Sequence, residues 1–241
     1  MKGVILAGGK GTRLYPLTHV TNKHLLPIYN QPMIYYPIQT LVGAGITEIL
    51  IVTGDIHAGH FINVIKNGKE LGLTHVGYAY QEGGSSGIAD ALKYAQDFAD
   101  GEPIAVILGD NTTDADISQA VKNFDGGAMV FLKEVPDPER FGIARLNRAN
   151  PQIIDEIIEK PAHPPSNLAV TGLYFYDSTV FDKIRTLQPS PRGELEVTDL
   201  NNAYIKEGQL KWTKLEGFWS DAGTFDSLFR ANAYWAQKKL T

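Results

Sequence analysis

Short apolar, β-branched runs alternate with longer amphipathic stretches through the first half of this sequence, and this alternation is what most constrains the fold. Apolar runs of strand length, separated by helical patterns, are typical of parallel strands joined by crossover helices. Strands are predicted over residues 3–7, 48–53, 76–81, 103–108 and 128–132, and helices over residues 32–44 and 87–99. The fold class predicted from this half is α/β, with a Rossmann-like, mixed and mostly parallel sheet flanked by helices.

The pattern changes after residue 140. The segments FGIARLN, QIIDEIIEKP and AVTGLYFYD have the character of strands with little helix between them. Helical patterns return over residues 178–187, 196–208 and 224–240. We therefore expect a small antiparallel excursion on the α/β body, within a single domain that spans residues 1–241.

Composition excludes several classes of protein. The chain has no cysteine, which rules out a disulfide scaffold, a thiol nucleophile and cysteine-based metal sites. Cysteine usage, and the absence of any apolar run of signal-peptide or membrane-spanning length, predict a cytoplasmic protein without a membrane partner. The formal net charge of −5 argues against a nucleic-acid partner. Positive charge that binds an anionic ligand must therefore be concentrated locally.

A glycine-rich segment, residues 6–18, directly follows the first predicted strand. Gly8, Gly9 and Gly11 remove side chains where a backbone must approach another group closely. Backbone N–H groups in such a turn can bind an anion, and Arg13 adds positive charge. The glycine spacing matches neither a P-loop nor the dinucleotide-binding fingerprint. The segment predicts a phosphate site, and an ordinary tight strand-to-helix turn is the alternative.

Further motifs follow in order. They are NKHLLPI, Gln81 ahead of Gly87-Ile88-Ala89, LGDN, ERFG, EKP, VTGLY, RGELEVTD and WSDAGT. Together with GGKGTRLYPLT, they resemble the signature of the sugar-phosphate nucleotidyltransferases, and most of all the short-form glucose-1-phosphate thymidylyltransferases. The resemblance covers nearly the whole chain. It implies transfer of a nucleotidyl group from dTTP to glucose 1-phosphate, giving dTDP-glucose and pyrophosphate by a Mg²⁺-assisted in-line displacement.

The resemblance also implies a role for each site residue. Asp110 and Asp221 would hold Mg²⁺, and Arg13, Lys23 and Asp110 would be catalytic. The nucleotide would be bound by Leu6, Gly8, Gly9, Gly11, Thr12, Arg13, Gln81 and Gly87. The sugar phosphate would be bound on the antiparallel excursion and nearby by Ile88, Gly142, Glu159, Lys160, Val170 and Arg192.

Physical chemistry explains why these residue types suit the reaction. A dianion must meet a polyanion, so catalysis depends mainly on positioning and charge neutralisation. Asp110 ends an apolar strand at the sheet edge where open α/β folds bind ligands, although it could equally cap a turn. Lys23 alone would more simply be a solvated surface charge, and Glu159-Lys160 a solvated ion pair.

Some positions depart from the family pattern. The loop from Gln81 to Gly87 has one extra residue and no proline, which leaves the choice between dTTP and UTP open. Phe141 stands where tyrosine is common, and His24 where glutamine is usual. The C-terminal helices of the longer branch are missing after Thr241, so we do not expect feedback through the allosteric nucleotide site associated with them. The oligomeric state is also open, and a homo-oligomer is compatible with the sequence.

Three other functions fit parts of the sequence. A uridylyltransferase would make a UDP-sugar from UTP, and a non-catalytic protein of the same fold would bind a nucleotide sugar without releasing pyrophosphate. A serine hydrolase is a remote alternative, because residues 83–87 match G-x-S-x-G with Ser85 as the nucleophile and His163 as the only later histidine. The run is rich in glycine and serine, so a chance match accounts for it more simply.

Overall fold

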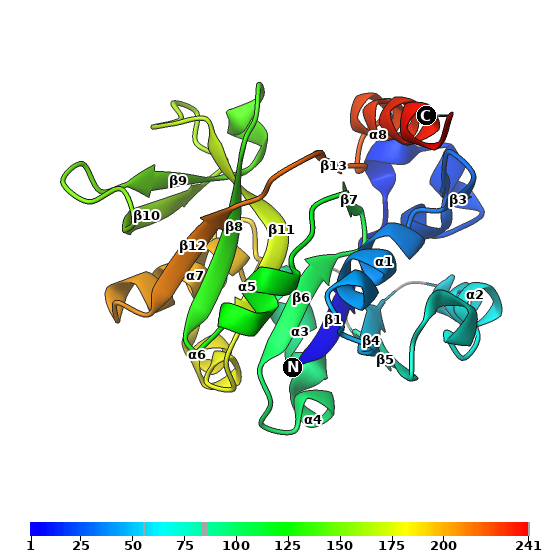
Figure 1. Cartoon of the computed structure of the whole chain (residues 1–241), viewed down its shortest axis with the longest axis horizontal. Coiled ribbons are helices and arrows are strands. Elements are labelled where there is room, and N and C mark those ends of the chain that lie inside the picture. Colours follow the sequence, from blue (N-terminus) through cyan, green and yellow to red (C-terminus); the bar gives the residue numbers. More distant parts are fainter. Residues whose placement is uncertain (55, 83–85, 241) are drawn as a thin grey trace.

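A nine-stranded sheet organises the chain, whose computed structural model describes residues 1–54, 56–82 and 86–240 (Figure 1). The strands are β1 Lys2–Leu6, β2 Pro27–Ile28, β3 Gln31–Pro32, β4 Glu48–Thr53, β5 His75–Tyr80, β6 Ile104–Leu108, β7 Asn111–Thr113, β8 Ala128–Glu134, β9 Gly142–Leu146, β10 Ile154–Glu159, β11 Leu168–Tyr176, β12 Leu210–Lys214 and β13 Trp219–Asp221. The α-helices are α1 Tyr35–Gly43, α2 Ala58–Ile65, α3 Ile88–Leu92, α4 Gln96–Ala99, α5 Ser118–Asn123, α6 Val180–Thr186, α7 Val197–Lys206 and α8 Phe225–Leu240.

The parallel half of the sheet has β1 at its centre. β1 pairs in parallel with β4 on one side and with β6 on the other, and β5 continues the sheet beyond β4. Successive β1 residues face opposite sides, so Val4 lies in one apolar core and Ile5 in the other, both fully buried. Burial on both faces explains why this strand is apolar throughout.

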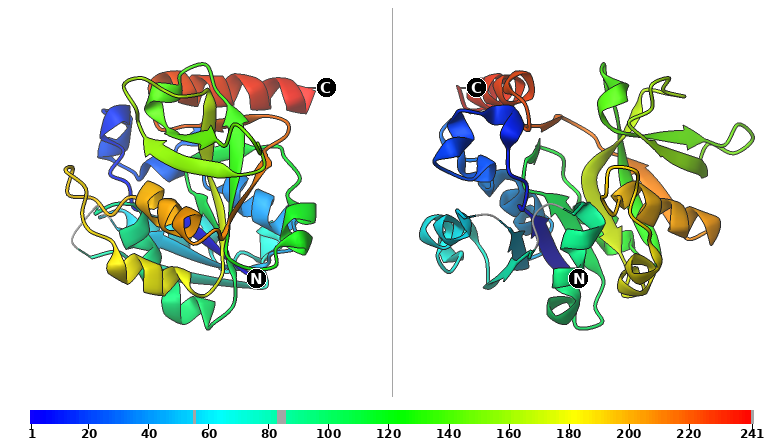
Figure 2. Two further views of the ribbon diagram at one scale, coloured as in Figure 1. Left: turned by 90° about the vertical axis from the view of Figure 1, so that its left-hand side faces the viewer. Right: turned by 180° about the vertical axis from the view of Figure 1, so that it is seen from behind.

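Helices cover both faces of the sheet (Figure 2). The core that contains Val4 also contains side chains of α3, α6 and α7, such as Leu200 and Tyr204. The core that contains Ile5 includes Ile38 of α1 and Phe61 of α2. None of the helices in the described part of the chain is long and apolar enough to cross a membrane.

Strand β11 joins the parallel half to the antiparallel part. One edge of β11 pairs with β8, with a register shift between Val170 and Tyr174. Its other edge is divided: residues 173–176 pair with β6, whereas Ala169 pairs with β9. The β9–β10 hairpin therefore projects to one side of the parallel strands (Figure 1). The predicted fold class, a mostly parallel sheet with an antiparallel excursion, is confirmed.

The last helix, α8, packs against the segment that follows β1. Ala231 of α8 lies in one apolar cluster with Leu14, Ile28 and Tyr36, all buried. In Figure 1 this helix, in red, lies beside the blue N-terminal segment. The two ends of the sequence thus stabilise each other next to the glycine-rich turn.

Candidate active site

One cavity of about 290 Å³ opens where β1 and β6 end. Leu6 and Leu108, the last residues of these strands, are in its lining. Of the residues predicted for the site, those that line the cavity are Leu6, Gly8, Gly9, Arg13, Lys23, Gln81, Gly87, Ile88, Asp110, Gly142, Glu159, Lys160, Val170, Arg192 and Asp221. Its position at the carboxyl ends of parallel strands is the usual ligand position in open α/β sheets.

The glycines of the first turn make room for two side chains that cross it. A Cβ on Gly9 would lie 3.2 Å from Lys23 Cε, and one on Gly11 would lie 2.9 Å from Lys23 Cβ. A Cβ on Gly8 would lie 2.8 Å from Gln81 Oε1. The turn therefore lacks side chains because Lys23 and Gln81 lie against its backbone on their way to the cavity.

Gly11 and Thr12 are the two predicted site residues that do not line the cavity. Gly11 has a left-handed backbone, with φ of 66°, and its carbonyl accepts a hydrogen bond from Thr18 Oγ1 (2.8 Å). Thr12 is exposed and begins the 3-10 turn Thr12–Leu14. Both residues belong to the turn but lie away from the cavity, and their assignment to the nucleotide stays a prediction.

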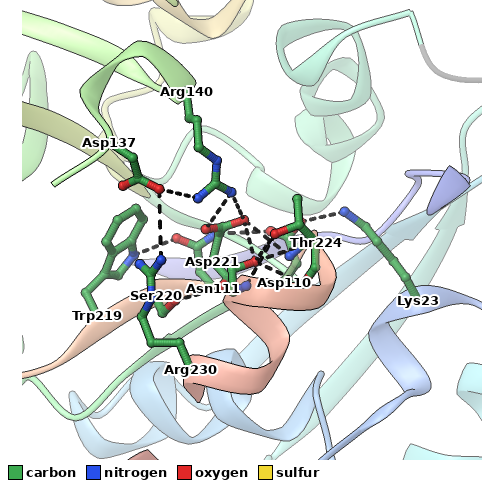
Figure 3. A network of polar contacts seen from close by, with 12 residues as sticks. Lys23, Asp110, Asn111, Asp137, Arg140, Trp219, Ser220, Asp221, Thr224 and Arg230 are labelled. Atoms are coloured by element: carbon green, nitrogen blue, oxygen red, sulfur yellow. Dashed lines mark hydrogen bonds and ion pairs between the residues drawn. The ribbon is translucent and has the colours of Figure 1, made fainter. Parts of the chain in front are cut away.

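The carboxylates of Asp110 and Asp221 face one small space beside Gly223 (Figure 3). The Oδ2 atoms of both residues lie 3.4 Å from the position that a Cβ on Gly223 would occupy, and Arg13 Nη2 lies 3.1 Å from it. Pairing of β7 with β13 brings the carboxylates together, since Asp221 is opposite Asn111 in that register. Two acidic residues more than 100 positions apart thus converge on a space that only glycine leaves open.

Cations neutralise both carboxylates from opposite sides (Figure 3). Lys23 Nζ donates to Asp110 Oδ2 (2.5 Å), and Arg140 Nη2 donates to Asp221 Oδ2 (3.0 Å) and Oδ1 (3.2 Å). Burial raises the pKa of Asp110, but the charge of Lys23 and hydrogen bonds from Lys23 and Asn111 hold that pKa well below its usual range. Asp110 is therefore ionised at neutral pH.

A divalent cation fits this donor set. Mg²⁺ prefers oxygen ligands, and it commonly takes one or two carboxylates together with waters and substrate phosphates. Asp110 and Asp221 provide two such carboxylates facing one space. In the described part of the chain no three His, Asp or Glu side chains are grouped to hold a metal, so water and phosphate oxygens would complete the coordination.

His24 and Asn111 fix the residues around the carboxylate pair. His24 is 2% exposed, and its Nδ1 donates to Asn22 Oδ1 (2.6 Å). Burial, and then the charge of Lys23, lower the pKa of His24 to about 3, so the ring is neutral and does not compete with Lys23 for Asp110. Asn111 Nδ2 donates to Asp110 Oδ1 (3.0 Å), and its Oδ1 accepts from Trp219 Nε1 (2.7 Å).

Gln81 presents an acceptor to the cavity because Asp90 fixes its amide group. Gln81 Nε2 donates to Asp90 Oδ2 (2.9 Å), and a carboxylate can only accept in this pair. Gln81 Oε1 is therefore left on the side of Gly8. Asp90 also accepts from Lys93 (2.9 Å), which holds the carboxylate in place.

On the side of the antiparallel hairpin, acidic residues position the cations. Arg192 Nη2 donates to both oxygens of Glu196 (2.8 Å each) and to Glu159 Oε1 (3.3 Å). Lys160 Nζ lies 3.4 Å from Glu159 Oε1, and Thr198 Oγ1 donates to Glu159 Oε2 (2.6 Å). The side chains of Lys160 and Arg192 stay 48% and 43% exposed, so both can reach an anion in the cavity.

Several cavity residues were missed at the sequence level. Arg140 and Glu196 line the cavity and stand within recognised motifs, whereas Asp90 lies outside the lining and fixes Gln81. The roles of all three depend on partners that spacing does not reveal. Arg140 could have been selected for its positive charge, because it stands in the ERFG motif. Of the serine-hydrolase alternative, Ser85 lies outside the described residues, and His163 is exposed and outside the cavity lining.

Comparison with known proteins identifies relatives over almost the full chain. The family model described as nucleotidyl transferase matches residues 2–238. A glucose-1-phosphate thymidylyltransferase of Xanthomonas campestris is 44% identical over 236 residues, which cover 95% of this chain and 79% of that relative. The enzyme of that name from Neisseria meningitidis is 41% identical, over 97% of this chain and 82% of the relative.

Solved structures agree with this result. The crystal structure of a Bacillus anthracis protein, provisionally named glucose-1-phosphate thymidylyltransferase and complexed with sucrose, has a TM-score of 0.91 and 49% identity, covering 97% of this chain and 94% of that one. A UDP-glucose pyrophosphorylase complexed with UDP-glucose has a TM-score of 0.84 at 24% identity, a likeness of fold alone, over 98% of each chain. The chain belongs to the nucleotidyl transferase family.

Proposed function

We infer that this protein is a glucose-1-phosphate thymidylyltransferase. It would transfer the nucleotidyl group of dTTP to glucose 1-phosphate, giving dTDP-glucose and pyrophosphate. Curated relatives of that name, at 39–44% identity over most of the chain, support the assignment. We propose that residues 1–241 act as one nucleotidyltransferase domain in the cytoplasm.

The observation that carries this proposal is the convergence of Asp110, Asp221 and Arg13 on the space beside Gly223. A triphosphate that meets a sugar phosphate brings two like-charged groups together, so the site must neutralise charge around the reacting α-phosphate. Arginine suits this position, since its planar guanidinium is always charged. Mg²⁺ bound by the two carboxylates would supply Lewis-acid polarisation of the phosphate oxygens.

The nucleotide would lie against the glycine-rich turn. Lys23 crosses that turn to the cavity and would contact the triphosphate, and Arg13 would stabilise charge at the α-phosphate. Thymine and uracil both present an N3–H donor, which the oxygen of Gln81 can accept. Gln81 thereby distinguishes these bases from cytosine, whose N3 is an acceptor, but not from each other.

The sugar phosphate would lie toward the β9–β10 hairpin. We assign its phosphate to Lys160 and Arg192, and its hydroxyls to Glu159 and the backbone of Gly142, with Ile88 and Val170 as an apolar wall. With the sugar phosphate held here and the triphosphate at the turn, one oxygen can attack the α-phosphorus opposite the departing pyrophosphate. Positioning of this kind is a major source of rate enhancement in phosphoryl transfer.

A panel of pyrophosphate-release rates tests the function. Release should need dTTP, glucose 1-phosphate and Mg²⁺ together. Faster release with UTP would make the protein a uridylyltransferase, and release without any sugar phosphate would make it a pyrophosphohydrolase. Binding of dTDP-glucose without any release would indicate a non-catalytic nucleotide-sugar protein.

Variants of the two carboxylates test the metal assignment. Asp110→Asn and Asp221→Asn should each lower kcat by at least ~100-fold, because loss of a metal ligand removes several kcal/mol of charge stabilisation. The matched control is Asp125→Asn, which changes an exposed aspartate paired with Lys211. Near wild-type rates in both site variants would exclude these residues as metal ligands.

A further inference from the structure

Arg140 spans the cavity between two parts of the structure. It ends the 3-10 turn Pro138–Arg140 that leads into β9, and its side chain reaches Asp221 on β13. Nη1 donates to Asp137 Oδ2 in the same turn (2.6 Å), and Nη2 donates to both oxygens of Asp221. The guanidinium carbon also lies 5.1 Å from the centre of the Phe141 ring. Arg140 is thus anchored at one end by its own turn and at the other by a metal-site carboxylate.

The two anchors differ in kind. Asp137 is three residues away in the same turn and has a second arginine nearby, since Arg230 Nη2 lies 3.9 Å from its Oδ2. Asp137 Oδ1 is buried and accepts no hydrogen bond from the described residues. Asp221 is 81 positions away, and Arg140 engages both of its oxygens. The contact with Asp137 is local, whereas the contact with Asp221 occupies the group assigned to the divalent cation.

We propose that Arg140 is a further phosphate-binding residue, held on Asp221 until that carboxylate takes a divalent cation. The proposal rests on the proposed function, because it uses the same carboxylates and the same triphosphate. Arg140 lies outside the set of residues that the sequence predicts for the site.

Arg140 and a divalent cation would compete for Asp221. The carboxylate has two oxygens, and Arg140 donates to both from one nitrogen. A cation bound at Asp221 would also repel the guanidinium, whose nearest nitrogen is 3.0 Å from Oδ2. Arg140 must therefore leave Asp221 before that residue serves a metal, and its presence lowers the affinity of the empty enzyme for the ion.

After its release from Asp221, the Arg140 side chain would remain beside the cavity. Nη1 can keep its hydrogen bond to Asp137, so the guanidinium stays at the cavity wall that it lines now. Its freed Nη2 hydrogens then need an acceptor, and phosphate oxygens are the acceptors that enter with the substrates. Arginine binds phosphate with two parallel hydrogen bonds in a favourable geometry. One side chain thus protects Asp221 in the empty site and contributes positive charge once the site is loaded.

A metal titration without substrate tests the competition. Mn²⁺ binding is measured by electron paramagnetic resonance for wild type, Arg140→Gln, Arg140→Lys and the control Arg145→Gln, an exposed arginine on β9. Arg140→Gln should bind Mn²⁺ about tenfold more tightly, because the internal cation is gone. Arg145→Gln and Arg140→Lys should match wild type. In an Asp221→Asn background the Arg140→Gln change should have no effect. Unchanged or weaker Mn²⁺ binding by Arg140→Gln would overturn the proposal.

Pyrophosphate binding tests the second role. In saturating Mg²⁺, calorimetry should show inorganic pyrophosphate binding to Arg140→Gln about tenfold more weakly than to wild type or Arg145→Gln. Equal pyrophosphate affinity would refute the phosphate contact. Both titrations are independent of turnover, so they give an answer even if wild type releases no pyrophosphate with any substrate pair. That last result would refute the proposed function and leave the Arg140 competition to be judged on Mn²⁺ binding.

Discussion

His24 provides a quantitative prediction because it is buried beside the charged residues of the site. Burial and Lys23 lower its pKa from 6.5 to about 3, so the folded protein keeps it neutral where an unfolded chain would protonate it. The unfolded chain therefore binds more protons below pH 6.5, and the free energy of unfolding falls as the pH decreases. Between pH 7.5 and pH 5 the loss is 1.5 pKa units, or ~2 kcal/mol at 1.36 kcal/mol per unit.

Urea unfolding at pH 7.5 and pH 5 measures this loss. His24→Gln removes the titrating group, so the variant should lose ~2 kcal/mol less than wild type between the two pH values. The control is His75→Gln, a change at an exposed position on β5. The lowered pKa of Asp110 does not interfere, because its effect on stability begins only near its ordinary value of 3.8. Equal losses in wild type and His24→Gln would refute the conclusion that His24 is neutral in the folded protein.

Three further predictions concern the cavity. Gly223→Ala adds a methyl group in contact with both carboxylates, at a backbone angle that alanine adopts without strain. The kcat should fall at least ~100-fold, while urea titration should give a free energy of unfolding within about 1 kcal/mol of wild type. Retained activity would show that the reaction does not use this space. Asp90→Asn lets the Gln81 amide turn either way, so the kcat/KM preference for dTTP over dCTP should fall about tenfold; an unchanged ratio would remove Gln81 from base selection. Glu196→Gln removes the charged acceptor that orients Arg192, so the KM for glucose 1-phosphate should rise about tenfold while the KM for dTTP stays constant. A lower KM for glucose 1-phosphate would mean that Glu196 competes with the phosphate for Arg192.

The parallel half of the sheet could be predicted because its strands are buried on both faces and are therefore apolar throughout. The observed β1, β4, β5 and β6 match the predicted runs within one residue at each end, and β8 begins where predicted but extends two residues further, to Glu134. The helix predicted over residues 87–99 is divided into α3, a 3-10 turn and α4. Strand β12 was not predicted, since LKWTK is short, contains two lysines and is stabilised by pairing with β8.

The site residues that could be predicted are likewise those whose signal is local in the sequence. Glycines and acidic residues at the ends of strands are recognisable from type and position, which is why Gly9 and Asp110 were selected. Gly9 is needed because Lys23 crosses it, and that contact exists only in the folded chain. Arg140 was missed because its partner, Asp221, lies 81 positions away. Residues that become neighbours only when β7 pairs with β13 are not separated by any characteristic spacing that could be recognised in the sequence.

Strand β11 has a mechanical consequence for the proposed reaction. It carries Ala169, which pairs with the hairpin on the sugar side, and Leu173, which pairs with β6 beside the phosphate side. Only three residues separate these two anchor points along one backbone. The sugar side and the phosphate side of the cavity are therefore coupled through one short stretch of backbone, so that a displacement of the hairpin would be transmitted directly to β6.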